Sequence, residues 1–427
     1  MSGAVSSTQL GHSTERKTTL CGNYSFAIRS GGHLPAPGAA NIDDGILIDL
    51  SRFDRVQYDA AKSLVSVGSG QRWGNVYSQL DQHNVTVVGG RVLDVGVGGL
   101  TLGSGLSYLS DLYGMVCDNV VSFEVVLANG SVVHASGASN QDLFWALKGG
   151  SNSFGIVTNL VLKTYPIQHI WGGIKGYTLD QLPSLLDALL EYQSAPSKER
   201  YANLMMQGFV TNATIGIALS VIYLKPEESP SVFKPFYNIS TAYDTTKLQT
   251  LYEFSGSQGA VSLPRVEQRA TSFKPTANLY DKLLGILTES PSLETIRSVT
   301  AGPSAFGLQP ISSSPVEAGR SQGGNALGLE AVNQTWVIMD SGWWFSDDDE
   351  PIHRATQDIV DSIENAPKEE GQYVEYIFIN DADWDQDVIG HYGTSNVKRL
   401  KMVQDQYDPD HVFQRLVLGG FKLPYIV

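Results

Sequence analysis

The sequence predicts an α+β protein with two domains. Its 427 residues exceed the roughly 250–300 at which one hydrophobic core stops growing. Short runs rich in Val, Ile and Leu alternate with segments of helical period. Glycine is concentrated at the start, with 23 of 43 glycines before residue 161. The first third of the chain therefore differs in character from the rest.

The predicted elements of the first domain are short strands joined by turns and two helices. Strands are predicted over 26–30, 45–50 and 64–68, and a strand over 155–166 is closed by proline. Val76 and Leu80 lie four apart and predict a helix over 73–84. Asn129-Gly130 predicts a two-residue hairpin turn, because both residue types tolerate positive φ. A short helix over 142–150 is ended by glycine.

After Pro166 glycine thins and the predicted elements become longer. Helices are predicted over 182–193 and 395–413, the latter ended by Asp408-Pro409, and strands over 213–224 and 335–345. Two Pro/Gly/Ser-rich segments, 226–235 and 303–325, are predicted to be loops. The acidic run 347–350 is interpreted as a solvated turn.

The composition excludes several classes of protein. With 42% apolar and 17% charged residues the chain is not disordered throughout. The net charge of −15 leaves no basic footprint for nucleic acid. No stretch reaches the ~18 apolar residues of a membrane span. Cys21 and Cys117 are too few for a metal cluster or a disulfide framework, while one disulfide and two free thiols both stay open.

Residues 1–24 are polar and aperiodic and are interpreted as a leader. They lack the apolar core of a signal peptide, so a cytoplasmic location is expected for the chain as it stands. Six N-x-[ST] sequons instead hint at a secreted ancestry, and the sequence leaves this conflict open. The sequons lie at Asn23, Asn84, Asn129, Asn212, Asn238 and Asn333.

The glycines of the first domain match neither common phosphate-binding motif. The segment 96–101 reads GVGGLT and lacks the third glycine of GxGxxG. Gly150 and Gly155 have P-loop spacing, but Ile156 stands where the lysine belongs. Any single cluster is interpreted as an ordinary tight turn. Together, four clusters suit a long anionic cofactor such as a dinucleotide, held by backbone N–H groups. They span residues 29–33, 95–105, 112–119 and 148–155.

These clusters, read in order, carry a resemblance to a known family. RSGGH (29–33), the segments around GVGGLTLGSG and KGGSNSFG, and the tail IFINDADWDQ…HYGTSNVKRLKM resemble the flavin-linked oxidases related to vanillyl-alcohol oxidase and p-cresol methylhydroxylase. Within that superfamily the chain is similar to the berberine-bridge-like FAD oxidoreductases of fungal secondary metabolism. The resemblance implies a PCMH-type FAD-binding domain over 25–168 and an α/β substrate domain with an antiparallel sheet over 169–385. A C-terminal segment, 386–427, would return to the FAD domain.

The resemblance implies a covalent flavin. Its members carry FAD on the histidine of the GGH motif, which here is His33. A second linkage through cysteine is not expected, because the matching position is Val92. Val95 matches the residue that controls access to the flavin, and a valine there is similar to the oxygen-reactive members.

Further cofactor-binding residues follow from the same match. Arg29, Ser30, Gly31 and Gly32 match the pyrophosphate loop, and Gly98, Gly99 and Gly103 match the loop beside the isoalloxazine. Asp118, Gly150 and Ile156 match positions near the ribityl or adenine part. Asn380 stands in a Tyr-x-Asn position of the family, where Phe378 replaces the tyrosine.

The expected reaction is an oxidation of a small-molecule substrate, with O₂ as electron acceptor. A hydride would pass from a substrate carbon to the flavin while a base removes a proton from a hydroxyl or an amine. Asp340 is the candidate base and Tyr376 the second candidate, although a solvated strand residue is the alternative for Asp340. Trp343 and Trp344 are interpreted either as a substrate wall or as core.

A different class of function is kept beside the oxidase. Members of the family usually have a strand–helix–strand lobe ahead of RSGGH, and the 28 residues before Arg29 lack its pattern. The FAD domain is therefore expected to be truncated at its N-terminus. The alternative is a flavin-free, inactive remnant that keeps the fold as a binding protein.

Overall fold

The computed structural model describes residues 3–6, 24–210, 215–257, 263–300 and 302–424. They fold as an α+β protein, which confirms the predicted class, and divide into two compact units. The first unit holds the described residues up to Gln168, with 316–329 and those from Asp387 onward. The second unit holds the described residues of 169–315 and 330–386. Among the described helices, none is long and apolar enough to cross a membrane.

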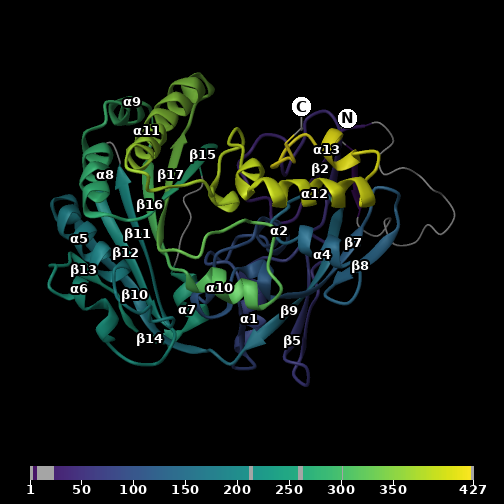
Figure 1. Ribbon diagram of the computed structural model, residues 1–427, viewed down its shortest axis with the longest axis horizontal. Helices are drawn as coiled ribbons and strands as arrows, with labels where there is room; N and C mark the ends of the chain where they lie inside the picture. Colours follow the sequence, from purple (N-terminus) through teal and green to yellow (C-terminus); the bar gives the residue numbers. More distant parts are fainter. Residues whose placement is uncertain (1–2, 7–23, 211–214, 258–262, 301, 425–427) are drawn as a thin grey trace. The chain divides into compact units, whose positions relative to one another are not determined.

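A small parallel sheet opens the first unit (Figure 1). Its strands, in the order β1-β3-β2, are β1 (Gly3–Ser6), β3 (Ile46–Asp49) and β2 (Phe26–Arg29). The strand β1 corrects the expectation that residues 1–24 are aperiodic. Its strand conformation depends on pairing with β3, which no local sequence pattern indicates. The rest of the expected leader, including Cys21 and the sequon Asn23, lies outside the described residues.

The second sheet of the first unit is antiparallel. Its central strand, β9, alternates buried and half-buried residues along most of its length, as a strand packed on one face does. The strands, in spatial order, are β4 (Val56–Asp59), β5 (Leu64–Gly68), β9 (Ile156–Tyr165), β7 (Val120–Val126) and β8 (Val132–Ser136), with β6 (Thr86–Val87) paired to β9.

The predicted hairpin between β7 and β8 is present, but its turn differs from the expected one. Only Gly130 has positive φ, at 79°, whereas Asn129 does not. The backbone N–H of Leu127 donates to the carbonyl of Ser131, so three residues form the loop. This matches the three-residue hairpin in which one glycine in the left-handed region closes the turn.

Helices of the first unit are mostly short. The helix α1 (Trp73–Asp81) buries Trp73, Val76, Tyr77 and Leu80, a helical face of the predicted period. The others are α2 (Val97–Gly103), α3 (Ser110–Tyr113), α4 (Gln141–Ala146), α10 (Ser314–Ser321, in this unit from residue 316), α12 (Thr394–Tyr407) and α13 (Val412–Arg415).

The C-terminal segment packs against the start of the first unit. The backbone N–H of Phe26 donates to the carbonyl of Leu416 at 2.8 Å, and the rings of Phe26 and Phe413 meet edge to face. These two phenylalanines share a buried cluster with Ile48, Ile156 and Val417. The helix α12 also lies on α4, where Arg399 stacks over Trp145 (Figure 1).

The second unit is built on an antiparallel sheet. Its spatial order is β13 (Tyr243–Asp244), β10 (His169–Thr178), β12 (Ile215–Tyr223), β11 (Ala202–Val210), β16 (Ser304–Ile311), β17 (Gln334–Trp343), β15 (Arg265–Phe273) and β18 (Tyr373–Val374), with β14 (Lys247–Thr250) also paired to β10. The antiparallel sheet expected for the substrate domain is therefore present.

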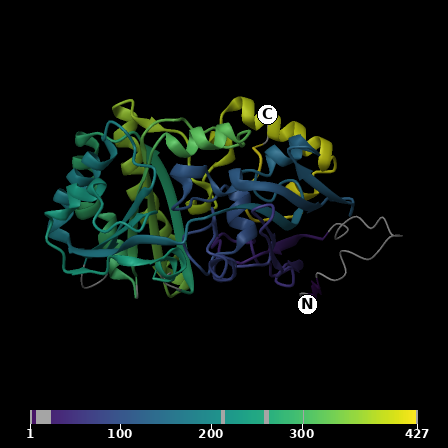
Figure 2. The same cartoon turned by 90° about the horizontal axis from the view of Figure 1, so that it is seen from below.

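Helices cover one face of this sheet, as Figures 1 and 2 show. They contribute the apolar core together with alternate residues of the strands, such as Met206, Leu308, Val337 and Met339. These helices are α5 (Leu182–Gln193), α6 (Lys234–Tyr237), α8 (Ala277–Glu289), α9 (Ser292–Ser298) and α11 (Asp349–Glu369). The helix α7 (Leu251–Gly256) lies on the opposite face, where its Phe254 is close to Gly172 of β10. The intervening residues of the strands lie on the opposite face of the sheet.

Three segments differ from the sequence predictions. The expected loop 303–325 contains β16 and α10, and 226–235 runs into α6. Pro310 is tolerated in β16 because pairing with β11 ends at Leu308, so its missing N–H is not needed there. The acidic run 347–350 is divided: Asp347 and Asp348 lie in a 3₁₀ turn, as expected for a solvated turn, while Asp349 and Glu350 begin α11, where carboxylates are favoured at a helix N-terminus.

Candidate active site

The loop after β2 lies directly against the loop before α2. A Cβ placed on Gly31 would come within 2.4 Å of the Gly96 Cα, and one on Gly96 within 2.4 Å of the Gly31 N. Only two glycines allow this approach of one backbone to the other. The structure therefore brings together RSGGH and GVGGLT, which are far apart in sequence.

Ser30 links three segments through its hydroxyl. The Ser30 Oγ donates to the Ser69 carbonyl at 2.5 Å and accepts from the Gly98 N–H at 3.2 Å. A Cβ on Gly98 would come within 2.9 Å of this hydroxyl oxygen. Ser30 and Gly98, both predicted to bind cofactor, thus hold the two loops in place.

Arg72, which the sequence analysis missed, joins the same loops. Its guanidinium donates to the Gly31 carbonyl at 2.8 Å and to the Asp94 carbonyl. It lies outside every glycine cluster, so no motif marks it. Arg29, in contrast, pairs with Asp49 on the neighbouring strand at 2.7 Å.

His33 is exposed at the end of this loop. Its pKa is lowered by partial desolvation of the ring and by the positive charge of Arg72, while Asp94 acts in the opposite direction. The imidazole is therefore neutral at pH 7 and keeps a lone pair available for bonding. Val92 and Val95 are half-buried nearby in sequence, before α2.

Several buried polar atoms in the glycine-rich segments have no protein partner. The hydroxyls of Ser69, Ser104 and Ser153 are buried and make no hydrogen bond within the described part of the chain. A Cβ on Gly99 would meet nothing within 4 Å, while Gly103 is buried in the same helix. Buried hydroxyls are nearly always satisfied. The unsatisfied hydroxyls, and separately the open space at Gly99, fit a polar cofactor such as a dinucleotide.

Asp118 has partners within the protein. It accepts from the Met115 N–H and from the Asn325 side chain, each at 2.9 Å. Burial raises its pKa, although Asn325 and Lys148 oppose the shift. Cys117, next to it, is a buried free thiol whose pKa is also raised by burial. Asp118 thereby links Asn325 to the 3₁₀ turn Val116–Asn119.

Gly150 and Ile156 serve packing in the structure. A Cβ on Gly150 would come within 2.4 Å of the Ala146 carbonyl and of the Phe154 ring. Ile156 lies in the buried cluster with Phe26 and Phe413. Their expected contact with the adenine or ribityl part stays a prediction.

In the second unit, Asp340 lies on the sheet face opposite the helices. Desolvation and the negative charge of Asp381 together raise its pKa to about 7, against the opposing effect of a hydrogen bond from Gln268. The Oδ1 atom of Asp340 is buried without a hydrogen-bond partner in the described residues. Gln309 donates to Asp381 at 3.1 Å and so fixes that second carboxylate. Sequence reasoning named Asp340 but missed these three neighbours, which come from other elements.

Aromatic rings surround the same sheet face. The ring of Trp336 stacks on Phe378 with centroids 4.7 Å apart and lies 5.3 Å from the ring of Tyr376. Asn380 is half-buried in the 3₁₀ turn Ile379–Asp381. Tyr376, the second candidate base, thus contacts Trp336, whereas Asp340 lies four residues from Trp336 on the same strand and the same face of the sheet.

The tryptophan pair divides between two environments. Trp343 is buried in the core and donates from its indole nitrogen to Asp349 at 2.6 Å. Trp344 is 51% exposed. The core interpretation therefore holds for Trp343.

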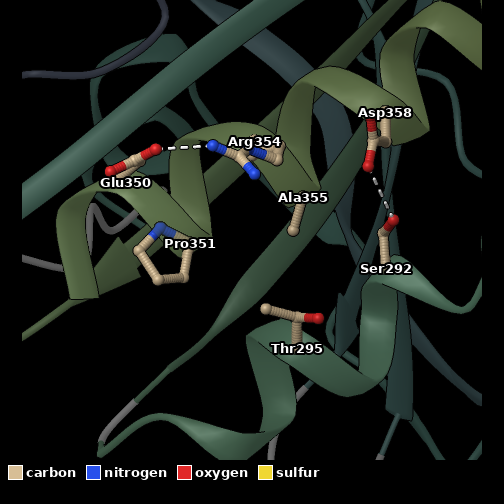
Figure 3. A pocket seen from close by; sticks show the side chains of 7 residues that line it. All are labelled: Ser292, Thr295, Glu350, Pro351, Arg354, Ala355 and Asp358. Atoms are coloured by element: carbon tan, nitrogen blue, oxygen red, sulfur yellow. Dashed lines mark hydrogen bonds and ion pairs between the residues drawn. The ribbon is translucent and has the colours of Figure 1, made fainter.

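A surface pocket between α9 and α11 is separate from all of these residues (Figure 3). Polar side chains line much of it. They include the ion pair of Glu350 with Arg354 and the hydrogen bond from Ser292 to Asp358. None of the predicted site residues borders it.

Comparison with known proteins identifies the class. The family described as FAD binding domain matches residues 19–136, and the family described as berberine and berberine like matches residues 376–415. An FAD-dependent monooxygenase of Cochliobolus heterostrophus, tpcD, is 34% identical over 94% of this chain and 80% of its own. The bifunctional solanapyrone synthase of Alternaria solani is 35% identical over 93% of this chain and 76% of its own.

The fold and these relatives define an FAD-dependent oxidoreductase. More narrowly, the chain belongs to the berberine-bridge-like family of FAD-linked oxidoreductases, alongside enzymes of fungal secondary metabolism. The resemblance found in the sequence is confirmed.

Solved structures share the fold. The 6-hydroxy-D-nicotine oxidase of Arthrobacter nicotinovorans has a TM-score of 0.76 at 19% identity, covering 95% of this chain and 88% of its own. Berberine bridge enzyme with (S)-reticuline scores 0.75 at 18% identity, over 95% and 85%. Glucooligosaccharide oxidase of Acremonium strictum, described with a 6-S-cysteinyl, 8α-N1-histidyl FAD, scores 0.74 at 21% identity, over 95% and 88%.

Proposed function

We propose that this oxidoreductase is an O₂-using oxidase of a hydroxylated or amine-bearing natural product. The observation that carries the proposal is Asp340, a carboxyl with a pKa of about 7 on the same strand and the same sheet face as Trp336. A general base works best when its pKa lies near the operating pH. The fungal relatives named above support a substrate from secondary metabolism.

Asp340 is the proposed base. FAD, when bound, supplies the acceptor for a hydride. As the substrate carbon loses that hydride, the ionised Asp340 takes the proton from the attached oxygen or nitrogen. The product would gain a C=O or C=N bond, and O₂ would accept the two electrons with two protons, one from the transferred hydride and one from Asp340, and leave as hydrogen peroxide. Gln268 and Asp381 set the ionisation of Asp340.

His33 is the proposed covalent anchor of the FAD. Its neutral ring and exposed position support this role, as does the histidyl-linked flavin of the glucooligosaccharide oxidase. No second bond is proposed, because valine occupies position 92. Ser30, Gly98 and Gly99 would hold the bound flavin, and Ser69, Ser104 and Ser153 would satisfy their hydroxyls on it. The small side chain of Val95 leaves room for O₂.

Anaerobic mixing tests the function. A panel of secondary alcohols, phenols and amines is mixed with the flavin-loaded enzyme, and bleaching of the flavin absorbance identifies the class that reduces it. Readmitted O₂ should restore the absorbance and produce one hydrogen peroxide per flavin. Asp340→Asn should slow reduction by about 100-fold or more, in line with loss of a general base.

Asp187→Asn is the matched control, because Asp187 is exposed on α5. It should reduce at the wild-type rate. If Asp340→Asn also reduces at that rate, Asp340 is not the base, and Tyr376→Phe becomes the next variant. If readmitted O₂ leaves the flavin bleached, the enzyme is a dehydrogenase.

A further inference from the structure

A second charged cluster lies in the second unit, on different residues from the proposed base. Glu267 and Arg269 extend from β15, His353 from α11, and Asp383 and Asp385 from the segment after the 3₁₀ turn 379–381. The side chains of Glu267, Arg269 and Asp383 are 3%, 6% and 5% exposed. Charged side chains are rarely buried to this extent unless they are paired or bind a metal.

The cluster has an excess of negative charge. Three carboxylates face one guanidinium, which leaves two negative charges when all the acids are ionised. Arg269 is already engaged by Asp385 in a two-pronged contact, at 2.5 Å to the Oδ2. Its distances to the other two carboxylates are longer, 3.3 Å to Glu267 and 3.7 Å to Asp383. One guanidinium cannot neutralise all three.

Glu267 and Asp383 are also short of hydrogen bonds. Both carboxylate oxygens of Glu267, and Oδ2 of Asp383, are buried and make none within the described part of the chain. Desolvation and the neighbouring carboxylates raise the pKa of Glu267 to about 8 and that of Asp383 to about 7. Atoms in this state are stabilised by a proton or by a cation.

His353 provides a third ligand at metal-binding distance. Its Nδ1 lies 3.2 Å from Glu267 Oε2 and 3.9 Å from Asp383 Oδ2. One atom from each of the three residues falls within 4.8 Å of the others. Ligands of a tetrahedral ion with bonds of ~2.1 Å lie ~3.4 Å apart, so small side-chain shifts would close the site.

The other nitrogen of His353 faces Asp385. Its Nε2 lies 3.4 Å from Asp385 Oδ2. A carboxylate behind a histidine orients the ring, as in many metal sites. Trp384 stacks on the same ring at 5.9 Å between centroids, and His353 is 31% exposed. The ring of His353 therefore lies on the solvent-facing side of the cluster, which is the side from which an ion would enter.

We propose that Glu267, His353 and Asp383 bind one divalent transition-metal cation of the Zn²⁺ or Mn²⁺ class. The two charges of such an ion cancel the two excess charges of the cluster. An imidazole with two carboxylates suits these ions, whereas Ca²⁺ and Mg²⁺ prefer oxygen ligands alone. The bound ion links β15, α11 and the segment 382–386, so its role is structural. The redox function proposed above does not depend on it.

Zinc titration tests this site. The flavin-loaded full chain is stripped with a chelator, dialysed and titrated with ZnCl₂ alone in a calorimeter. One Zn²⁺ per chain should bind, and the melting temperature should rise with Zn²⁺ concentration, because an ion that binds only the folded state stabilises it. His353→Asn should lose both the binding and the temperature rise, and Asp383→Asn should weaken the affinity by at least tenfold.

His169→Asn is the control, since His169 is an exposed histidine on β10. It should keep the full stoichiometry and the temperature rise. The proposal is overturned if the wild type binds no Zn²⁺, or if His353→Asn binds as much as His169→Asn. If Asp383→Asn fails to fold, His353→Asn still decides, because its side chain lies partly at the surface. Mn²⁺, followed by loss of its free-ion EPR signal, repeats the test with a second probe.

Discussion

Identical side chains acquire different chemistry from their surroundings in this protein. The pKa of Asp49 is lowered: burial acts to raise it, but hydrogen bonds from Arg29 and Ser51 outweigh that effect. The pKa of Asp340 is raised to about 7, because burial and Asp381 outweigh Gln268. The family resemblance could indicate Asp340 as a base. It could not indicate the neighbours that tune it, because they come from different strands and turns.

Removal of the second carboxylate should shift the pH profile. Asp340 is active when ionised, so flavin reduction should rise with pH through about 7. Asp381→Asn removes a negative charge and so makes ionisation of Asp340 easier. The rise of the reduction rate with pH, the acid limb of the profile, should therefore move to lower pH by on the order of one unit. The measurement is the pH dependence of the anaerobic reduction rate. Asp347→Asn, an exposed site, should leave the limb in place. If the acid limb of Asp381→Asn lies at the same pH as in the wild type, the electrostatic coupling between Asp381 and Asp340 is contradicted.

Secondary structure could be predicted where the local pattern of apolar residues favours the same element that tertiary packing requires. The period of buried residues in α1, α5 and α12 and the apolar runs of β7 and β9 are visible in the sequence. The segment 303–325 was not, because prolines and glycines suggested a loop. There β16 forms between β11 and β17, whose residues lie roughly 30 to 100 positions away. Long-range pairing of this kind leaves no local signal.

Asp408 is predicted to stabilise the C-terminal segment by capping the N-terminus of α13. It is fully buried, and its carboxylate accepts the backbone N–H groups of Val412 and Phe413 at 2.9 and 2.8 Å. Asp408→Ala leaves both donors of α13 without a partner and should lower the free energy of unfolding by about 1–2 kcal/mol. Urea denaturation measures the loss. Asp410→Ala, two residues away and exposed, should be neutral. Equal effects of the two variants would rule out this capping role.

At the scale of the whole molecule, the sequence motifs predicted the family. The contacts that these segments make with one another could be seen only in the structure. Four glycine clusters, read in order, indicated a flavin-binding chain. The structure shows a packing role for some of these glycines, since Gly31 and Gly96 allow contact between two loops and Gly150 allows close packing, while their contact with FAD stays a prediction. Arg72 and the cluster of Glu267, His353 and Asp383 carry no motif, because each depends on residues brought together from separate elements.

The same loops define the central claim, that the chain holds FAD through His33. Acid precipitation followed by mass spectrometry of the peptides measures this directly. The wild type should give a yellow pellet and a peptide containing His33 that carries the mass of FAD. His33→Ala should release its flavin to the supernatant, while His83→Ala, an exposed histidine of the first unit, should keep it attached. A colourless wild-type pellet, or flavin attached to any other residue, would contradict the account.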